Sequence, residues 1–425
     1  MRIAFIVDKL PVPSETFVLR QIQGFLDRGH EVFVLAAKYD DSVVNPLRGR
    51  VTLRVFRRDL GILRHAIRFA RLSALASIDV NGRKRLSVAL RAAVTGCRSA
   101  FIDIVSGGET AGVEFDVVIA HFGPIGVRAM YLHEAGLLTG PIVTVFHGAD
   151  MSERAVVERC LPHYRRLFRM SPLLLPISNL WRDRLIQWGA PESRTKVHHI
   201  GIDVHRLTAE AINRPVHRPL KVLSVARFTE KKGLAYAIEA VRHCKHPVEL
   251  NVIGFGPLED NLRRAAFSSV NQINFLGMRS HEQVFDELKK ADVFLLPSVV
   301  ASNGDMEGIP VSIMEAMASS VIVVATRHSG IPELVTHGVT GLLVEERSAS
   351  GIAEALSAIA EGRVSIEAIR RNARCKVEKD FNGQTLDADL ERLLIRTLGC
   401  PPSSNREARD FHGREIAAGF DRPLT

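Results

Sequence analysis

Short apolar runs alternate with longer amphipathic segments along almost the whole chain. The runs are rich in Val and Ile, and the segments between them carry apolar residues at helical spacing. This alternation predicts parallel strands joined by crossover helices. The predicted strands are residues 3–7, 31–36, 51–55, 115–120, 142–146, 173–176 and 195–199 in the first half, and 221–226, 248–253, 274–276, 293–297, 321–324 and 341–344 in the second. The sequence therefore predicts an α/β protein with two doubly wound parallel sheets.

The alternation pauses between residues 200 and 220, in a polar stretch that contains Pro215 and Pro219. This stretch is too irregular for a core element and long enough to act as a hinge. We expect one domain over residues 1–205, a linker over 206–220 and a second domain over 221–398. Residues 399–425 are polar and rich in Pro and Ser at their start, so we expect a flexible tail.

Two helix starts are marked by serines in the sequence. Ser280 is followed three residues later by Gln283, the pattern of a capping box, and Ser178 precedes the segment that holds Trp181. We expect a helix to begin directly after each serine.

The composition is that of an ordinary globular chain. Of the 425 residues, 46% are hydrophobic and 24% are charged. The longest stretch without Asp, Glu, Lys or Arg is residues 135–149, which Gly136, Gly140 and Pro141 interrupt. It is too short and too broken to cross a bilayer, so a transmembrane transporter is excluded. Asp8 and Lys9 end the first apolar run before a signal-peptide core could form, so we expect a cytoplasmic protein.

The five cysteines are scattered and never form a C-x-x-C pair. They suggest neither a disulfide framework nor a zinc site. We expect thiols without a chemical role.

Basic residues are concentrated in one segment. The whole chain has 56 Lys or Arg against 47 Asp or Glu, a net charge of +9, while residues 48–98 alone hold thirteen basic and two acidic residues, a net charge of +11. Leu60, Leu63, Ile67 and Ala70 recur there at helical spacing, and Arg64, Arg68 and Arg71 follow a neighbouring stripe. Three interpretations stay open: an anionic membrane surface, a nucleic acid, or a solvated face. Nucleic acid is the least favoured, because no nucleic-acid-binding motif is present.

Two turns after predicted strands of the second half could hold a nucleotide. Arg227 follows one strand, and Lys232 opens the next helix, so both cations could reach a diphosphate in the crevice at the strand ends. They could equally be two surface cations. The next strand ends in a turn with Gly254 and Gly256, but Glu259 stands where a dinucleotide fingerprint needs glycine, so a tight turn without a ligand is an equal alternative.

The segment 303–318 contains two acids in apolar surroundings. Pro310 suits the first turn of a helix, which places Glu307 in the loop before it and Glu315 about a turn and a half inside. Buried carboxylates need partners, and sugar hydroxyls are suitable ones. One carboxylate at the mouth of the site would suit a transferred sugar and a deeper one a ribose, and the helix N-terminus between them would meet phosphate. The family resemblance described next assigns these roles to Glu307 and Glu315, respectively.

Six motifs occur in an order that resembles the retaining glycosyltransferases of family 4. They are Glu307-x7-Glu315, Arg227 with Lys232-Gly233, Gly254-x-Gly256-Pro257, Asn274-Phe275-Leu276-Gly277, Ser329-Gly330-Ile331-Pro332-Glu333 and Gly338-x-x-Gly341-Leu342-Leu343-Val344. In the first half, the segments 12–18, 28–32, 120–123 and 146–150 look like the branch that builds bacterial exopolysaccharides, similar to the colanic acid and amylovoran galactosyltransferases. The resemblance implies the GT-B fold, in which two Rossmann-like domains face each other across a cleft.

The resemblance also implies roles for individual residues. Catalytic roles fall to Glu307, to Arg227 and Lys232 on the donor diphosphate, and to His147, which would meet the sugar and phosphate from across the cleft. The implied donor site comprises Arg227, Lys232, Gly254, Gly256, Gly308, Ile309, Pro310, Val311 and Glu315, and the implied acceptor side comprises Ser14, Glu15, Thr16 and His121.

The implied reaction moves a hexosyl group from a nucleotide-sugar, expected to be a UDP-sugar, to a saccharide or polyprenyl-diphosphate-linked acceptor with retention of configuration. We expect no cofactor and no metal, because the only Asp-x-Asp, Asp387 to Asp389, reads as the solvated face of a C-terminal helix. The expected partners are the donor, the acceptor and, through residues 48–98, the anionic inner face of the cell membrane, but no nucleic acid. An epimerase or phosphorolytic enzyme on the same scaffold, or a catalytically silent membrane-associated scaffold, remains an alternative.

Overall fold

The chain folds around two six-stranded sheets in which all paired strands are parallel. The computed structural model describes residues 1–12, 15–40, 47, 49–55, 62–106, 113–209, 212–267 and 269–399. The strand order is β3-β2-β1-β4-β5-β6 in the first sheet and β12-β11-β10-β7-β8-β9 in the second. Both are doubly wound orders, so the predicted α/β fold with two parallel sheets is confirmed.

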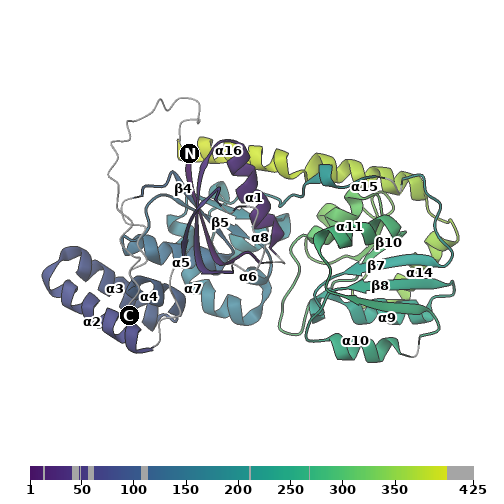
Figure 1. Ribbon diagram of the computed structural model, residues 1–425, viewed down its shortest axis with the longest axis horizontal. Coiled ribbons are helices and arrows are strands. Elements are labelled where there is room, and N and C mark those ends of the chain that lie inside the picture. Colours follow the sequence, from purple (N-terminus) through teal and green to yellow (C-terminus); the bar gives the residue numbers. More distant parts are fainter. Residues whose placement is uncertain are drawn as a thin grey trace, which may run out of the picture.

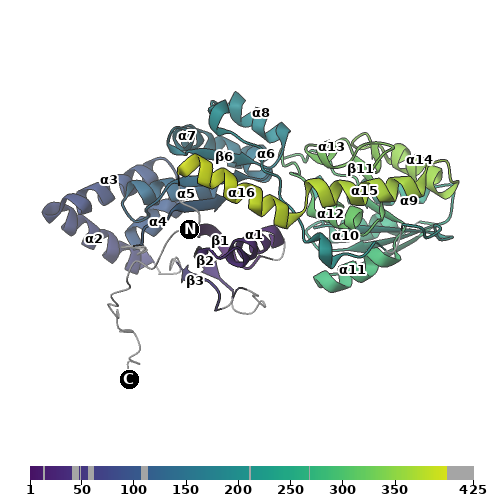
Figure 2. The ribbon, with the colours of Figure 1, turned by 90° about the horizontal axis from the view of Figure 1, so that it is seen from above.

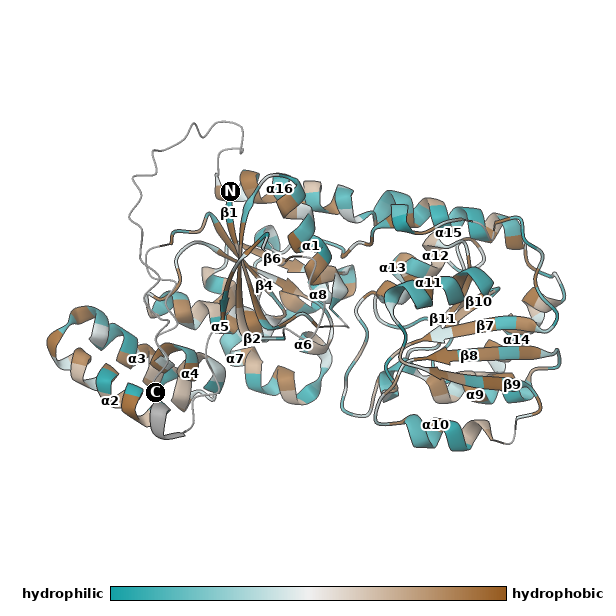
Figure 3. Ribbon diagram, in the orientation of Figure 1, coloured by the Kyte–Doolittle hydropathy of each residue, from teal (hydrophilic) through white to brown (hydrophobic). Residues whose placement is uncertain are grey.

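The strands occupy nearly the residues that the apolar runs predict. The first sheet contains β1 (Arg2–Leu10), β2 (Glu31–Tyr39), β3 (Thr52–Val55), β4 (Val117–His121), β5 (Ile142–Phe146) and β6 (Leu173–Pro176). The second contains β7 (Leu220–Val225), β8 (Val248–Ile253), β9 (Gln272–Gly277), β10 (Val293–Leu296), β11 (Ile322–Thr326) and β12 (Leu342–Val344). Helices cover the faces of both sheets, so β4, β5, β10 and β11 are buried along their whole length (Figure 3). Burial on both faces explains why these strands read as continuous apolar runs.

Most helices connect one strand to the next, and α14, α15 and α16 follow the last strand (Figure 1). Those of the first half are α1 (Thr16–Asp27), α2 (Ile62–Ile78), α3 (Val80–Val94), α4 (Arg98–Ser106), α5 (Gly123–Glu134), α6 (Ala149–Ser152), α7 (Arg154–Met170) and α8 (Asn179–Gln187). Those that follow are α9 (Leu234–His243), α10 (Glu259–Ala266), α11 (His281–Lys290), α12 (Val311–Ala318), α13 (Ile331–Leu334), α14 (Ala349–Ala360), α15 (Ile366–Asp380) and α16 (Gly383–Leu398). Three short 3-10 helices add η1 (Glu192–Arg194), η2 (Val204–Arg206) and η3 (Glu230–Lys232).

Both predicted helix starts are confirmed. The Ser280 hydroxyl accepts a hydrogen bond from the Gln283 amide at 3.2 Å, and the Gln283 side chain accepts one from the Ser280 amide at 3.0 Å. The Ser178 hydroxyl accepts one from the Trp181 amide at 3.3 Å. These bonds satisfy amides that the first turns of α11 and α8 leave free.

The predicted strand over residues 195–199 is wrong. The chain runs beside β6 there, and Thr195 forms a single isolated bridge with Leu174. Lys196 and His198 donate to the Leu174 and Pro176 carbonyls at 3.0 and 2.9 Å, and the register goes no further. Val197 is the one aliphatic residue of this stretch, so the segment lacks the apolar run that stabilises the buried strands.

The last helix returns to the first half of the molecule. Figures 1 and 2 show α15 and α16 running from the second sheet to the first, where α16 lies along α1. Arg20 on α1 forms a bidentate ion pair with Asp387 on α16, at 2.8 and 2.9 Å. Asp387 is buried, so its interpretation as part of a solvated face is wrong. The expected domain limits stay a prediction. By its residue numbers α16 belongs to the expected second domain, but it packs on α1 of the expected first domain.

A helical hairpin projects from the first half. Helices α2 and α3 pack against each other and extend away from the second sheet in both views (Figures 1 and 2). Helix α2 confirms the helical spacing predicted around Ile67 and Ala70, although Leu60 and the side chains of Leu63 and Arg64 lie outside the described residues. Within the described ranges, the chain has no helix with the length and apolar character needed to cross a membrane.

Candidate active site

Two opposite charges from neighbouring strand ends meet in the second half. Lys232 ends η3, which follows β7, and Glu307 lies in the loop between β10 and α12. The Lys232 Nζ and Glu307 Oε1 atoms are 2.9 Å apart, and both side chains are largely buried. Gly233 makes this approach possible, because it has φ 62° and a Cβ there would lie 1.8 Å from the Pro297 carbonyl oxygen. The fold thus brings together two residues that the sequence predicts for the donor site.

Glu307 is ionised in this environment. Burial raises its pKa, but the charges of Lys232 and Lys231 lower it by more, so the pKa of Glu307 lies below its usual value. Glu307 can therefore accept hydrogen bonds, for instance from hydroxyl groups, and it gives Lys232 a fixed position.

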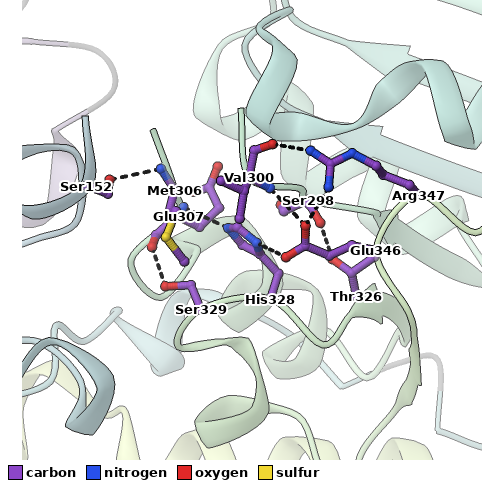
Figure 4. Close-up of polar contacts among 10 residues, drawn as sticks. All are labelled: Ser152, Ser298, Val300, Met306, Glu307, Thr326, His328, Ser329, Glu346 and Arg347. Atoms are coloured by element: carbon purple, nitrogen blue, oxygen red, sulfur yellow. Dashed lines mark hydrogen bonds and ion pairs between the residues drawn. The ribbon is translucent and has the colours of Figure 1, made fainter. Parts of the chain in front are cut away.

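A buried histidine holds the backbone at Glu307 (Figure 4). The Glu307 amide donates to His328 Nε2 at 3.0 Å, and His328 Nδ1 lies 2.6 Å from Glu346 Oε1. Because Nε2 accepts, the proton of the ring is on Nδ1 and is donated to Glu346. The Ser329 hydroxyl donates to the Glu307 carbonyl at 2.6 Å, so both the backbone amide and the backbone carbonyl group of Glu307 are fixed. The sequence analysis missed His328 and Glu346, although His328 follows β11 at the strand edge where ligand-binding residues gather.

Glu315 has a different partner. It lies inside α12, is 7% exposed, and its Oε1 atom is 2.7 Å from Nε2 of His281, the first residue of α11. The two acids of the predicted motif are therefore held separately, Glu307 by a lysine and Glu315 by a histidine that the sequence analysis did not single out. The capping residue Ser280, directly before His281, was the sequence feature that could have pointed to this histidine.

A cavity joins Glu315 to the first half of the chain. It has a volume of about 340 Å³ and lies between α1 and the pair α11 and α12. Its lining includes Thr16, Arg20, His281, Val311 and Glu315. The structure thus places one expected acceptor-side residue, Thr16, in the same cavity as two expected donor-site residues.

The backbones of the two halves touch beside Glu307. A Cβ on Gly308 would lie 2.1 Å from the His147 carbonyl oxygen, and a Cβ on Gly148 would lie 2.9 Å from the Gly308 amide nitrogen. The Met306 amide also donates to the Ser152 hydroxyl at 2.9 Å (Figure 4). Glycine is needed on both sides of this contact, which places His147 opposite the loop that carries Glu307.

His147 is held from three sides at the end of β5. Its Nε2 atom lies 3.0 Å from His121 Nδ1, and the rings of Phe17 and Phe122 lie 4.8 and 4.4 Å from its own, centroid to centroid. The Asp150 carboxylate accepts hydrogen bonds from the amides of His147 and Gly148, at 3.1 and 2.8 Å, and fixes the turn. Burial lowers the pKa of His147 well below its usual value, so the ring is neutral.

The remaining donor-site candidates are placed but not paired. Arg227 is exposed, and its side chain makes no hydrogen bond or ion pair with the residues that the structure describes. Gly254 has φ 139°, and a Cβ there would lie 1.9 Å from the Ala226 carbonyl oxygen; one on Gly256 would lie 2.7 Å from that of Phe228. Packing between the ends of β7 and β8 therefore already accounts for both glycines, and their contact with a nucleoside stays a prediction.

Three other candidates differ in their surroundings. Ile309 is buried before α12. Burial, with the nearby charge of Asp8, raises the pKa of Glu15 to about 7. Ser14 lies outside the described residues.

No metal site is apparent in the described part of the chain, where no three His, Cys, Asp or Glu side chains are grouped to hold an ion. Metal independence remains a prediction that only an assay can test.

Comparison with known proteins gives three kinds of likeness. Residues 206–376 match the family described as glycosyl transferases group 1. The chain is 39% identical to the putative colanic acid biosynthesis glycosyltransferase WcaL of Escherichia coli over 93% of its own length and 99% of that protein. It is 36% identical to the amylovoran biosynthesis glycosyltransferase AmsK of Erwinia amylovora over 93% of its own length and all of AmsK.

A solved structure is similar over nearly the same length. Anabaena HepE, crystallised with UDP and glucose, superimposes with a TM-score of 0.69 at 20% identity, covering 93% of this chain and all of HepE. At this identity the likeness concerns the fold alone.

Proposed function

The chain belongs to the group 1 glycosyl transferases and has the GT-B fold, and from that premise we propose that it transfers a hexosyl group from a UDP-sugar to a saccharide acceptor with retention of configuration. One observation carries the proposal: the ion pair of Lys232 and Glu307 lies beside the backbone contact with His147. A cation for a leaving diphosphate and an anion for sugar hydroxyls are thus available where the two halves meet.

The donor diphosphate is assigned to Lys232 and Arg227. Arg227 is exposed after β7 and has no acidic partner among the described residues, so its charge is available to a ligand. Lys232 already lies at a fixed place, and the N-terminus of α12 adds its positive dipole nearby. Fixed positive charges of this kind stabilise the negative charge that develops as the nucleotide leaves.

The sugar is assigned to Glu307 and His147. The ionised Glu307 accepts hydrogen bonds from sugar hydroxyls, and its ion pair with Lys232 favours this orienting role over covalent attack on the sugar. In the proposed step the acceptor oxygen forms a bond to the anomeric carbon on the face from which the diphosphate leaves. The bond from that carbon to the phosphate oxygen breaks, and the acceptor proton passes to that oxygen.

The donor class and the pathway are proposed from the relatives. The HepE structure contains UDP and glucose, which supports a UDP-sugar as the donor. WcaL and AmsK are named for the biosynthesis of colanic acid and amylovoran, which supports a role in the synthesis of an exopolysaccharide. The retaining outcome rests on the sequence resemblance to family 4.

The acceptor is proposed to be lipid-linked and presented at the inner face of the cell membrane. The turn of the α2–α3 hairpin exposes Ile78 by 83% and Val80 by 70%. Arg71, Arg83 and Lys84 are exposed on the same hairpin. Exposed apolar side chains next to cations that have no acidic partner among the described residues suit the boundary between anionic headgroups and acyl chains.

The expected basic stripe is only partly available for lipid. Arg68 donates a hydrogen bond to the Ser106 carbonyl oxygen, and Arg91 lies 3.5 Å from the Glu134 carboxylate. The membrane contact is therefore assigned to the hairpin turn and its neighbouring cations.

The test of the function is a transfer assay with a panel of sugar nucleotides and a membrane lipid extract. We expect UDP release together with a new glycolipid whose anomeric configuration matches that of the donor. An inverted product would contradict retention, and release of another nucleotide would contradict the UDP assignment. A new sugar nucleotide formed without acceptor would indicate an epimerase, and no turnover would indicate a silent scaffold. An unchanged rate with a chelator would support metal independence.

A further inference from the structure

Three buried side chains form a continuous hydrogen-bonded row that ends at the candidate site. The side-chain carbonyl oxygen of Gln21, Oε1, on α1 lies 2.9 Å from His121 Nε2 at the end of β4. His121 Nδ1 in turn lies 3.0 Å from His147 Nε2 at the end of β5. Gln21, His121 and His147 are 5%, 1% and 6% exposed, so water does not compete along the row. His147 Nδ1 is the one ring nitrogen of the row without a hydrogen-bond partner among the described residues.

Both imidazole rings of the row carry a single proton. Burial lowers the pKa of His121 to about 3, with help from the nearby His198 and Arg20, and burial also lowers the pKa of His147. A neutral imidazole has one donor nitrogen and one acceptor nitrogen. The direction of the first hydrogen bond therefore sets the direction of the second.

Gln21 sets that direction, because a carbonyl oxygen can only accept. His121 must then donate from Nε2, which leaves its Nδ1 as an acceptor. His147 must donate from Nε2 to that nitrogen, which leaves its own Nδ1 with a free lone pair. The row ends in an acceptor.

Two aromatic side chains pack against the His147 ring. Phe17 packs on this ring from α1, and Phe122 packs on it from the end of β4. The backbone of Phe122 has φ 74°, a conformation that costs a non-glycine residue free energy. Strain that is held in place by packing is common at functional sites.

We propose that Gln21 and His121 are positioning residues that present His147 Nδ1 as a hydrogen-bond acceptor for one hydroxyl of the transferred sugar. On this assignment His147 cannot donate to the diphosphate, and phosphate charge is left to Lys232 and Arg227. The inference rests on the proposed function for its ligand, whereas the row itself can be measured on the protein alone.

The first experiment reads the tautomer by nitrogen-15 NMR of the full chain labelled at histidine, with His147 identified by the signals lost in His147→Asn. We expect His147 Nε2 to carry the proton and Nδ1 to be bare. Gln21→Met removes the acceptor at nearly constant size, and we expect a mixture of His147 tautomers in it. Gln21→Glu keeps an acceptor, and we expect a single tautomer. A wild-type ring protonated at Nδ1, or an unchanged tautomer in a folded Gln21→Met, overturns the proposal.

The second experiment uses donors that each lack one sugar hydroxyl. With the wild type, we expect one of these donors to react about tenfold more slowly than the full donor. With His147→Ala, we expect that donor and the full donor to react at the same rate, because the hydrogen bond to the missing hydroxyl is already absent. Gln21→Met should lower kcat/KM about tenfold for the full donor, and Gln21→Glu should restore it. If every donor that lacks a hydroxyl loses the same factor relative to the full donor in His147→Ala as in the wild type, the hydroxyl assignment is overturned. A wild type with the expected tautomer but without any transfer would contradict the proposed function instead.

Discussion

The ammonium of Lys232 lies 2.9 Å from the carboxylate of Glu307, although the two residues are far apart in the sequence. Each gives the other an opposite charge in a largely buried place. The proposed chemistry uses these charges in different ways, with the lysine on the leaving diphosphate and the glutamate on the sugar.

Lys232→Met should lower kcat/KM for sugar transfer by about 100-fold or more, because one fixed cation at a developing negative charge contributes that much. Initial rates of nucleotide release measure it. Lys290→Met is the control, because Lys290 pairs with Glu287 on the exposed face of α11 at 2.7 Å, and its rate should match the wild type. A Lys232→Met rate within fivefold of the wild type would rule out the assignment.

Glu307→Ala should abolish transfer and leave the fold intact, as circular dichroism can verify.

Glu315→Gln should weaken donor binding more than it slows turnover. The amide has no charge and replaces one of the two acceptor oxygens by a donor, which weakens the proposed bonds to the ribose hydroxyls and the 2.7 Å contact with His281, so KM for the donor should rise about tenfold. Titration of UDP by calorimetry should show the same factor. A lower kcat at constant KM would place Glu315 in the chemical step rather than in binding.

Asp387→Ala should destabilise the chain by about 3 kcal/mol, because it leaves the Arg20 guanidinium without its partner in a mostly buried place. Urea denaturation gives the change in the free energy of unfolding. Glu31→Ala is the matched control, since it breaks the exposed Arg2–Glu31 pair and should cost less than 1 kcal/mol. Equal losses in the two variants would show that the buried Arg20–Asp387 pair contributes no more to stability than an exposed pair.

Glu15→Gln should be more stable than the wild type at alkaline pH. Burial and the charge of Asp8 raise the pKa of Glu15 from 4.5 to about 7, so the folded state holds this proton more tightly than the unfolded state. Stability of the wild type is therefore lost as pH rises from about 4.5 to 7. We expect the two proteins to unfold alike at pH 4 and to differ by about 3 kcal/mol at pH 8 in urea titrations. Asp8→Asn should shrink the difference; a difference that does not vary with pH would refute the raised pKa.

Ile78→Asp combined with Val80→Asp should reduce flotation with anionic vesicles by tenfold or more, because both side chains are exposed at the hairpin turn. Val270→Asp is the control: Val270 is 99% exposed but lies in the second half, and its substitution should change nothing. Replacing Arg71, Arg83 and Lys84 by Gln should weaken binding by about 1 kcal/mol for each charge. Equal binding to neutral vesicles would contradict the membrane assignment.

Much of the secondary structure could be predicted from local pattern. The buried strands appear as Val- and Ile-rich runs, and Ser280 with Gln283 marks the start of α11 without any knowledge of the fold. The prediction for residues 195–199 was wrong because the segment has one aliphatic residue, Val197, and forms a single bridge with β6 rather than a ladder.

The partners of the charged residues could not be predicted in this way. Asp387 looks solvated on a helical wheel, but α16 packs on α1 and buries it against Arg20. The row from Gln21 through His121 to His147 joins three elements, and no spacing along the chain encodes it.

The sequence by itself determined which residue types stand at the strand ends, and thereby two parallel sheets with cations, carboxylates and glycines at their edges. Only the tertiary structure decided which of them meet: Lys232 with Glu307, Glu315 with His281, and Gly308 with the His147 carbonyl. The physical reason is range. Hydrophobic periodicity and helix capping act over a few residues, whereas ion pairs, buried hydrogen bonds and close backbone contacts join segments that only the packing of both halves brings together.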